Sequence, residues 1–383
     1  MYMLRHCSLT LSGPKSGWRP RLTRSIPATN IVLGVFLFFS STVVSAQSRH
    51  DPAFWQAIVK NQYAVPERES ADSMAEELSG LLASPDPELR DDFAYAILTN
   101  WIYRRNLLSD ATLIGLTDAW LASLRDGLGE TGTNSVLKRS FSALCLSSMA
   151  AREAKVSFMG AQRYHQLVSE AMSYLQAERD LRGYDAKLHW IHATAHTADL
   201  LAALANNPQL TREESAGILS TISTRLATAP EVYTQGEQDR LAAAVLAVIR
   251  RPDFDALKFE NWLKGIQLED RDVWTTTTPE ALARYQNHTY LLQALFVRLA
   301  LQPDFPRKAD FNQKVLSFLK TRIPLLARRN SLPNVHHSNC STGPAKRAGQ
   351  PQSVLSTSIS ATGWNRFWLT FARETFSLSN RSV

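Results

Sequence analysis

The sequence predicts an all-α protein, and more specifically a right-handed α-solenoid of degenerate helix pairs of the HEAT or armadillo type. Three observations predict this class. Helix start signals recur along the chain, apolar residues after each signal follow the helical period, and no stretch alternates as a strand does. A globular helical bundle and an α/α toroid with one central cavity are the competing architectures, because no strict internal repeat is visible.

The start signals predict about a dozen helices, most of roughly 12–20 residues, within residues 47–329. A capping residue precedes a proline, which suits the first helical position, at Asp51-Pro52, Asp86-Pro87 and Thr278-Pro279. Two segments fit the reciprocal capping box: Ser73-x-x-Glu76 and Thr211-x-x-Glu214. Apolar residues follow at helical spacing, most clearly after Asp86: Phe93, Ile97, Leu98, Trp101 and Ile102. We therefore expect residues 47–329 to form one helical domain.

The first 46 residues have the layout of a secretory signal peptide. They carry five cations and no acid, and an apolar run extends from Asn30 to Val44. This run is shorter than the roughly 20 residues that span a bilayer, and it ends in the small-x-small pattern Val44-Ser45-Ala46. We expect residues 1–46 to be removed and the protein to be exported to the periplasm or the extracellular space. An uncleaved anchor is the alternative, and no later segment predicts a transmembrane helix.

The positive charge lies at the two ends of the chain. The whole chain carries +7. Removal of the five cations before residue 47 leaves +2, and residues 330–383 contribute +4, so the helical domain itself is slightly acidic. A nucleic-acid-binding protein needs a basic patch on its folded domain. The charge distribution therefore argues against a nucleic-acid partner.

Residues 330–383 differ in composition from the rest of the chain. About half of residues 331–363 are Ser, Thr, Pro or Gly, and none is acidic. Such a composition buries too little apolar surface to order itself, so we expect a basic, largely disordered tail, unless the reading frame is shifted there. A short amphipathic piece, residues 363–376, closes the tail. Of the two cysteines after residue 46, Cys145 lies in an apolar helix and Cys340 in this tail, which gives no disulfide framework.

One stretch concentrates polar residues that can carry chemistry. RGYDAKLHWIHATAHTADLL, residues 182–201, holds three of the nine histidines of the chain. We expect a helix to end at Arg182-Gly183 and the next to begin after Asp185. On that helix His189, His192, His196 and Asp199 would share one face.

The spacing of these four residues limits which of them can bind the same metal ion. His192 and His196 are one turn apart and can share an ion, whereas His192 and Asp199 are about 10.5 Å apart along a helix axis. A closed zinc site, or one for another divalent metal, would need a further ligand. The candidates are Glu178, Asp180, Glu237, Asp239 and His288.

The structural alternative is a hydrogen-bonded network. In it Asp180 or Asp199 holds an imidazole and Arg182 pairs with Glu178 or Asp180. Two acidic pairs are better interpreted as favourable charge in the first turn of a solvated helix than as catalytic groups: Asp91-Asp92 and Glu237-x-Asp239.

Three motifs carry a resemblance to a known family. Arg139-Ser140-Phe141-Ser142-x-Leu144 is followed by Glu178-x-Asp180-Leu181-Arg182-Gly183-Tyr184, and then by Trp190-x-His192-Ala193-x-Ala195-His196-x-Ala198-Asp199-Leu200-Leu201. Over roughly Asp51 to Leu326 the chain resembles bacterial domain-of-unknown-function family 2785. His189 departs from the pattern, which has glycine there. The resemblance implies an all-helical, HEAT-like domain, often in secreted or cell-surface proteins.

Two functions remain open. The first is a secreted binding or scaffolding module whose concave face grips a protein, peptide or glycan. Its contact residues, or alternatively a structural polar network, would come from one set: Glu178, Asp180, Arg182, Tyr184, Trp190, His192, His196 and Asp199. The second is a metal-assisted hydrolase that uses His192, His196 and Asp199. No nucleotide-binding or serine-hydrolase motif is present, so the sequence names no catalytic residue.

Overall fold

A computed structural model describes residues 49–322, and within them the predicted all-α class is confirmed. Twelve α-helices follow one another: α1 (Pro52–Lys60), α2 (Ala71–Leu81), α3 (Ala96–Thr99), α4 (Asp110–Ser123), α5 (Ser135–Lys155), α6 (Gly160–Ala177), α7 (Ala193–Ala205), α8 (Arg212–Thr228), α9 (Glu237–Ile249), α10 (Ala256–Glu269), α11 (Pro279–Leu301) and α12 (Lys308–Arg322). The expected signal peptide and the expected tail lie outside the described residues. None of these helices is long and apolar enough to cross a membrane.

The helix starts follow local capping chemistry. Asp51 caps α1 and Thr278 caps α11, each accepting from a backbone N–H three residues on, and Thr211 opens α8 with the full capping box. The capping box expected at Ser73 is wrong. Ser70 caps α2 instead, because its hydroxyl is placed to accept the N–H of Ser73.

The segment after Asp86 is helical but wider than an α-helix. Two π-helical stretches, η1 (Glu88–Tyr95) and η2 (Asn100–Arg104), flank α3. Their i→i+5 hydrogen bonds include Ala96 N–H to Asp91 O and Arg105 N–H to Asn100 O. The five apolar residues expected in this segment are all buried. The apolar period therefore predicted the helix but not its widened turns.

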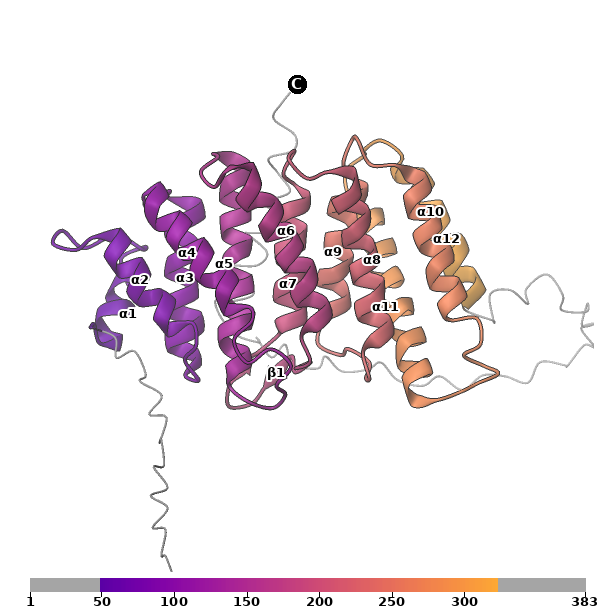
Figure 1. The fold of residues 1–383 in the computed structure, drawn as a ribbon, viewed down its shortest axis with the longest axis horizontal. Coiled ribbons are helices and arrows are strands. Elements are labelled where there is room, and N and C mark those ends of the chain that lie inside the picture. Colours follow the sequence, from indigo (N-terminus) through magenta and orange to yellow (C-terminus); the bar gives the residue numbers. More distant parts are fainter. Residues whose placement is uncertain (1–48, 323–383) are drawn as a thin grey trace, which may run out of the picture. The chain divides into compact units, whose positions relative to one another are not determined.

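The helices pack against neighbours close in chain order. Helix α5 packs on α7, α7 on α9, and α9 on α11, while α4 packs on α5, α6 on both α7 and α8, and α8 on α9, α10 and α11. Figure 1 shows the helices succeeding one another from α1 to α12. Every residue of α5 from Arg139 to Glu153 is buried, and so is every residue of α7 except Ala202. Cys145 lies in α5 as expected, and burial raises the pKa of its thiol.

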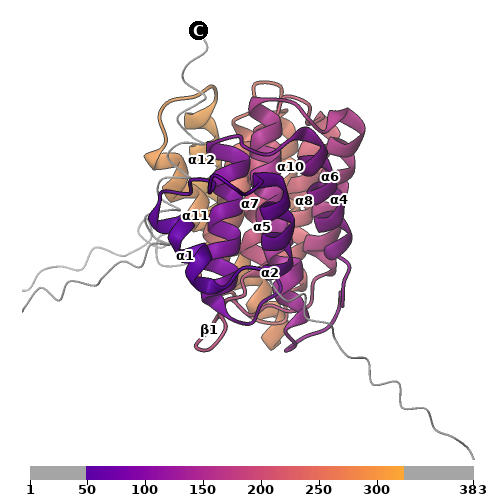
Figure 2. The ribbon, with the colours of Figure 1, turned by 90° about the vertical axis from the view of Figure 1, so that its left-hand side faces the viewer.

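A two-stranded hairpin interrupts the helices between α6 and α7. Strands β1 (Tyr184–Asp185) and β2 (His189–Trp190) pair antiparallel, Tyr184 with Trp190 and Asp185 with His189. The hairpin protrudes at one end of the helices (Figures 1 and 2). The sequence predicted no strand, and this small element is the exception within the described range.

Candidate functional site at the start of α7

The predicted histidine stripe on one helix is wrong. Helix α6 ends at Ala177, and α7 begins only at Ala193. His189 therefore lies in β2 and His192 precedes α7 as its cap residue, while His196 and Asp199 lie on α7. The Asp185 carboxylate accepts the backbone N–H groups of Lys187 and Leu188 and closes a turn. Such side-chain-to-backbone bonds compete with helix formation.

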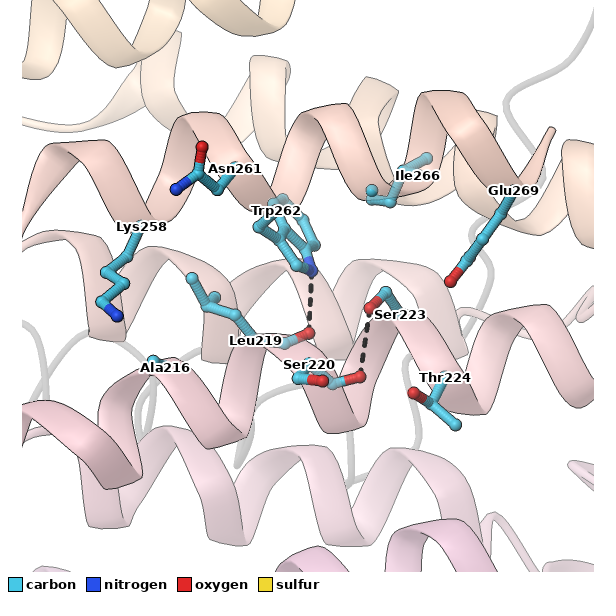
Figure 3. Close-up of a pocket in the computed structure, with 11 residues that line it drawn as sticks. Ala216, Leu219, Ser220, Ser223, Thr224, Lys258, Asn261, Trp262, Ile266 and Glu269 are labelled. Atoms are coloured by element: carbon cyan, nitrogen blue, oxygen red, sulfur yellow. Dashed lines mark hydrogen bonds between the residues drawn. The ribbon is translucent and has the colours of Figure 1, made fainter. Parts of the chain in front are cut away.

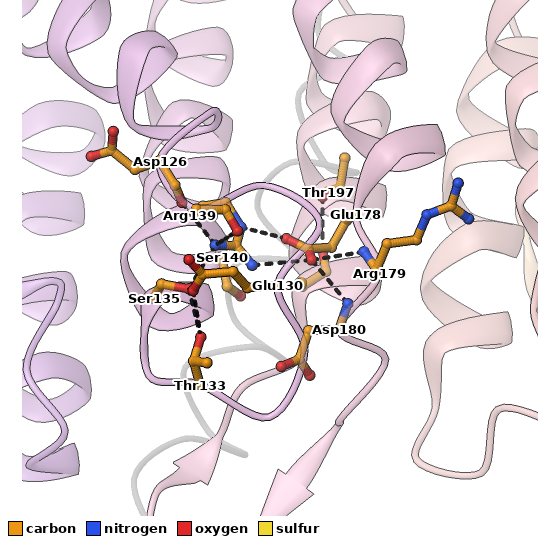
Figure 4. A network of polar contacts seen from close by, with 12 residues as sticks. Asp126, Glu130, Thr133, Ser135, Arg139, Ser140, Glu178, Arg179, Asp180 and Thr197 are labelled. Atoms are coloured by element: carbon orange, nitrogen blue, oxygen red, sulfur yellow. Dashed lines mark hydrogen bonds and ion pairs between the residues drawn. The ribbon is translucent and has the colours of Figure 1, made fainter. Parts of the chain in front are cut away.

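The loop that leads into the hairpin begins with a buried ion pair. The Arg139 guanidinium donates to both carboxylate oxygens of Glu178, Nε to Oε2 at 2.7 Å and Nη2 to Oε1 at 3.1 Å. Arg139 also donates to the carbonyls of Asp126 and Gly127, and Glu178 accepts the N–H groups of the two residues that follow it. Figure 4 shows this network joining α5 to the loop after α6.

A second ion pair extends the network to the loop before α5. Arg182 pairs with Asp180, with Nη2 2.6 Å from Oδ2, which confirms one of the two pairings expected for Arg182. Asp180 also accepts the N–H of Gly132, and Arg182 donates to the carbonyl of Thr133. Asp180 therefore bonds to Arg182 and to the backbone of the loop before α5. It does not bond to an imidazole, as had been one expectation.

Gly183 allows the hairpin to approach the loop before α9. A Cβ atom on Gly183 would lie 2.0 Å from Gln235 Oε1 and 2.7 Å from Glu237 Oε1. The expected helix end at Gly183 is wrong, because α6 already ends at Ala177, and the φ angle of Gly183 lies outside the left-handed region. Glycine suits this position because the side chains of Gln235 and Glu237 occupy the space that a Cβ atom would take. The N–H of Tyr184 hydrogen-bonds to Gln235 Oε1 at this contact.

The hairpin carries an aromatic cluster. The Tyr184 ring stacks on His189 with centroids 5.8 Å apart and meets Trp190 edge-on at 5.0 Å. The Trp190 ring stacks in turn on His192 at 4.8 Å. Tyr184 is 45 % exposed, His189 is exposed and Trp190 is half-buried. The hairpin therefore has two solvent-exposed rings, Tyr184 and His189, and Trp190 connects them to the buried ring of His192.

The backbone under this cluster is strained at two points. His189 has φ 57° and His192 has φ 50°, in the left-handed region that disfavours residues with a Cβ. A left-handed backbone suits glycine, the residue that the family resemblance implies in place of His189. His192 is held by its ring, whose Nε2 lies 3.1 Å from Gln235 O and 3.2 Å from Glu237 Oε1. Both partners are acceptors, so Nε2 carries the hydrogen.

Glu237 is a buried partner of His192. The expectation of a solvated first turn at Glu237 is therefore wrong, whereas Asp239 is exposed as expected. Burial favours the neutral form of Glu237, but the hydrogen bond and charge of His192 outweigh it, and the pKa of Glu237 is lowered. Of the candidate extra ligands named from the sequence, Glu237 is the one that contacts a histidine of the stretch, whereas His288 pairs with Asp270.

His196 and Asp199 have other partners on neighbouring helices. The Ser140 hydroxyl donates to Ile191 O and lies 2.8 Å from His196 Nδ1, so this nitrogen carries the hydrogen of the second bond. Burial lowers the pKa of His196 well below its usual range, so the ring is neutral. Asp199 pairs with Arg240 at 2.6 Å, and burial raises the pKa of Asp199 despite that cation.

The described residues do not supply a set of ligands for the predicted metal site. The His192 and His196 rings lie 6.0 Å apart, but across residues 49–322 no three His, Cys, Asp or Glu side chains are grouped to hold an ion. The metal site with His192, His196 and Asp199 remains a prediction from spacing.

Arg90, which the sequence did not single out, and Asp91 lie beneath the hairpin. Arg90 donates to Leu188 O in the hairpin turn and lies over the Phe141 ring. Asp91 is buried beside Arg90, and its Oδ1 lies 2.7 Å from Arg90 Nε. Burial raises the pKa of Asp91 to about 7. The interpretation of Asp91 as solvated helix-end charge is wrong. The sequence did not indicate that Asp91 is buried, because an Arg-Asp pair of adjacent residues is also found on solvated helices.

Comparison with known proteins gives one match. The family model described as "Protein of unknown function (DUF2785)" matches residues 124–297, which include all three motifs of the resemblance. This span is shorter than the one expected from the resemblance. No curated protein and no solved structure matches the chain.

Proposed function

We propose that this chain, which belongs to the DUF2785 family through residues 124–297, is an exported binding module whose contact surface is the aromatic face of the hairpin. One observation carries the proposal: partly exposed rings stand on a backbone fixed by buried polar contacts. Tyr184 and Trp190 supply the rings, and Gly183, His192 and Glu237 fix the strands from below. A rigid aromatic surface loses little conformational entropy when it binds.

The contact surface is assigned to the hairpin rather than to the central helices α5 and α7. Helices α5 and α7 expose almost no side chain, whereas the hairpin presents Tyr184, Lys187 and His189 to solvent. Tyr and Trp combine a large apolar ring with a polar group and are enriched where proteins bind ligands.

Among the expected ligand classes, a glycan fits this surface best. A sugar ring offers a C–H face to the Tyr184 or Trp190 ring and hydroxyl groups to nearby polar side chains. Asp185 and Lys187 belong to the same hairpin, and Gln235 accepts the N–H of Tyr184, so all three offer polar groups that can exchange hydrogen bonds with hydroxyls. Protein and peptide ligands are the other outcomes of the test.

The larger architecture belongs to the same proposal. The packing of α5 on α7, α7 on α9 and α9 on α11 supports a right-handed α-solenoid of HEAT-like pairs over residues 47–329. The cationic and then apolar sequence of residues 1–46 supports export. Mass spectrometry of the exported protein should find a chain that begins at Gln47, and a retained N-terminus would contradict this.

The first experiment measures binding of the purified mature protein to an oligosaccharide array. The variants are Tyr184→Ala and Trp190→Ala, and the control is Tyr290→Ala on α11, whose side chain is similarly exposed at 42 %. We expect each hairpin variant to weaken binding about tenfold, equivalent to about 1.4 kcal/mol, while the control binds as the wild type does. Equal effects in all three variants, or no oligosaccharide bound, would contradict the proposal.

The hydrolase alternative needs a bound metal. Elemental analysis of the same protein, beside His192→Ala/His196→Ala, measures this directly. About one equivalent of zinc or another divalent metal, lost in a still-folded variant, would favour the hydrolase.

A further inference from the structure

A cleft with a mixed apolar and polar lining lies between α8 and α10, on residues that the hairpin proposal does not use. Its volume is about 300 Å³. One face of each helix lines it: Ser220 and Thr224 from α8, and Lys258, Trp262, Gly265 and Glu269 from α10 (Figure 3). These positions recur every three or four residues, so each helix presents one stripe to the cleft.

Small side chains keep the cleft open and one large side chain fixes its wall. A Cβ atom on Gly265 would meet no atom within 4 Å. The Trp262 indole N–H donates to Leu219 O at 2.8 Å and so spans from α10 to α8. The space is therefore already formed without a ligand.

The two ends of the cleft carry opposite charges. Lys258 and Glu269 are eleven residues apart on α10, a rise of about 16 Å, and Figure 3 shows both reaching from α10 toward α8. In the described part of the chain Lys258 forms no ion pair. Glu269 Oε2 lies 3.7 Å from Nε2 of the buried His288. Hydroxyl groups of Ser220 and Thr224 lie between the ends.

We propose that this cleft binds a short zwitterionic peptide, with the carboxylate at Lys258 and the amino group at Glu269. Two or three extended residues span roughly 7–10 Å, and the reach of the two charged side chains covers the remainder. A dianion would meet Glu269 and a polyamine would meet Lys258, so the charge pattern disfavours ligands of a single sign. The volume is at the lower end of ligand sites, which suits a ligand of this size.

The test is calorimetric titration of the mature protein with trialanine, its N-acetyl derivative and its C-terminal amide. We expect a Kd of about 0.1–1 mM for trialanine and at least tenfold weaker binding of each blocked peptide. Lys258→Ala should weaken trialanine at least tenfold and leave the amide unchanged. Glu269→Gln should weaken trialanine likewise and leave the acetylated peptide unchanged.

Gly265→Leu is the variant that separates the cleft from the fold. Its side chain enters open space on a helix, so the protein should stay folded while trialanine binding is lost. Gly115→Leu is the matched control, because a Cβ on Gly115 of α4 also meets nothing within 4 Å. Absence of trialanine binding to the wild type, or binding that survives Gly265→Leu, would overturn the proposal. Neither result bears on glycan binding at the hairpin.

Discussion

Arg139 and Glu178 form a two-point ion pair in which neither side chain is more than 3 % exposed. The pair joins the middle of the domain to the loop that leads into the hairpin, and both residues belong to the motifs of the family resemblance. Buried charges are costly unless they are paired and hydrogen-bonded. Here every guanidinium nitrogen has an acceptor. The motif residues at this place therefore have a structural role that local sequence cannot show.

Glu178→Gln should lower the free energy of unfolding by about 3–5 kcal/mol, because it leaves Arg139 buried without its counter-charge. Urea unfolding of the purified protein measures this. The control is Asp118→Asn, which breaks the exposed two-point pair with Arg163, and it should cost less than about 1 kcal/mol. Similar losses in both variants would show that burial does not govern the cost.

Gly183→Ala should destabilise the protein by about 1 kcal/mol, because the new methyl group would displace the Gln235 side chain and break its hydrogen bond with the N–H of Tyr184. Gly265→Ala, with open space around its Cβ, should instead stabilise its helix by up to about 1 kcal/mol. Thermal unfolding distinguishes the two directions. A neutral Gly183→Ala would contradict a stabilising role of the contact between Gln235 and Tyr184.

His189→Gly should raise the free energy of unfolding by about 0.5–1 kcal/mol, because it removes a Cβ from a left-handed backbone. His192→Gly should lower it, although φ is equally positive there, because the ring bonds to Gln235 and Glu237 are lost. Denaturant unfolding measures both changes. Two changes of the same sign would contradict this division between strain and anchoring.

Asp91 should make the protein less stable as pH rises from 5 to 8. Burial raises the pKa of Asp91 to about 7 in the folded state, whereas its ordinary value is 3.8. At a pH between these two values, Asp91 therefore takes up a proton when the protein folds. The stabilising proton is lost as pH rises through 7. Asp91→Asn should remove about 2 kcal/mol of this dependence, while Asp126→Asn at an exposed position should not. Parallel stability curves for wild type and Asp91→Asn would contradict the assignment.

Local chemistry made part of the fold predictable from the sequence. Asp51, Thr211 and Thr278 cap helices where expected, because a cap depends only on residues within one turn. The apolar period after Asp86 gave a buried helix for the same reason. The helices that the sequence predicted best are thus those whose start depends on neighbouring residues and not on contacts with distant ones.

The candidate site depended on contacts between distant residues, and there the sequence misled. The segment from Glu178 to His192 leaves the helical path because Arg139, Gln235 and Glu237 hold it from other elements. Helical spacing placed four polar residues in one stripe, but a left-handed backbone at His192 redirects the chain. Two contacts join residues that were both named from the sequence: Arg182 with Asp180, and His192 with Glu237. Glu178 and Asp199 instead pair with Arg139 and Arg240, which helical spacing did not identify as partners.

The network around Asp180 has a consequence for the motions of this end of the domain. Asp180 and Arg182 bond the backbone at Gly132 and Thr133, Arg139 bonds the carbonyls of Asp126 and Gly127, and Gln235 bonds the hairpin. Three loops far apart in sequence are thus cross-linked by hydrogen bonds, most of which are charge-assisted. They should open together rather than one by one, so their amide protons should exchange with one shared opening free energy, close to that of the adjoining turns of α5 and α7.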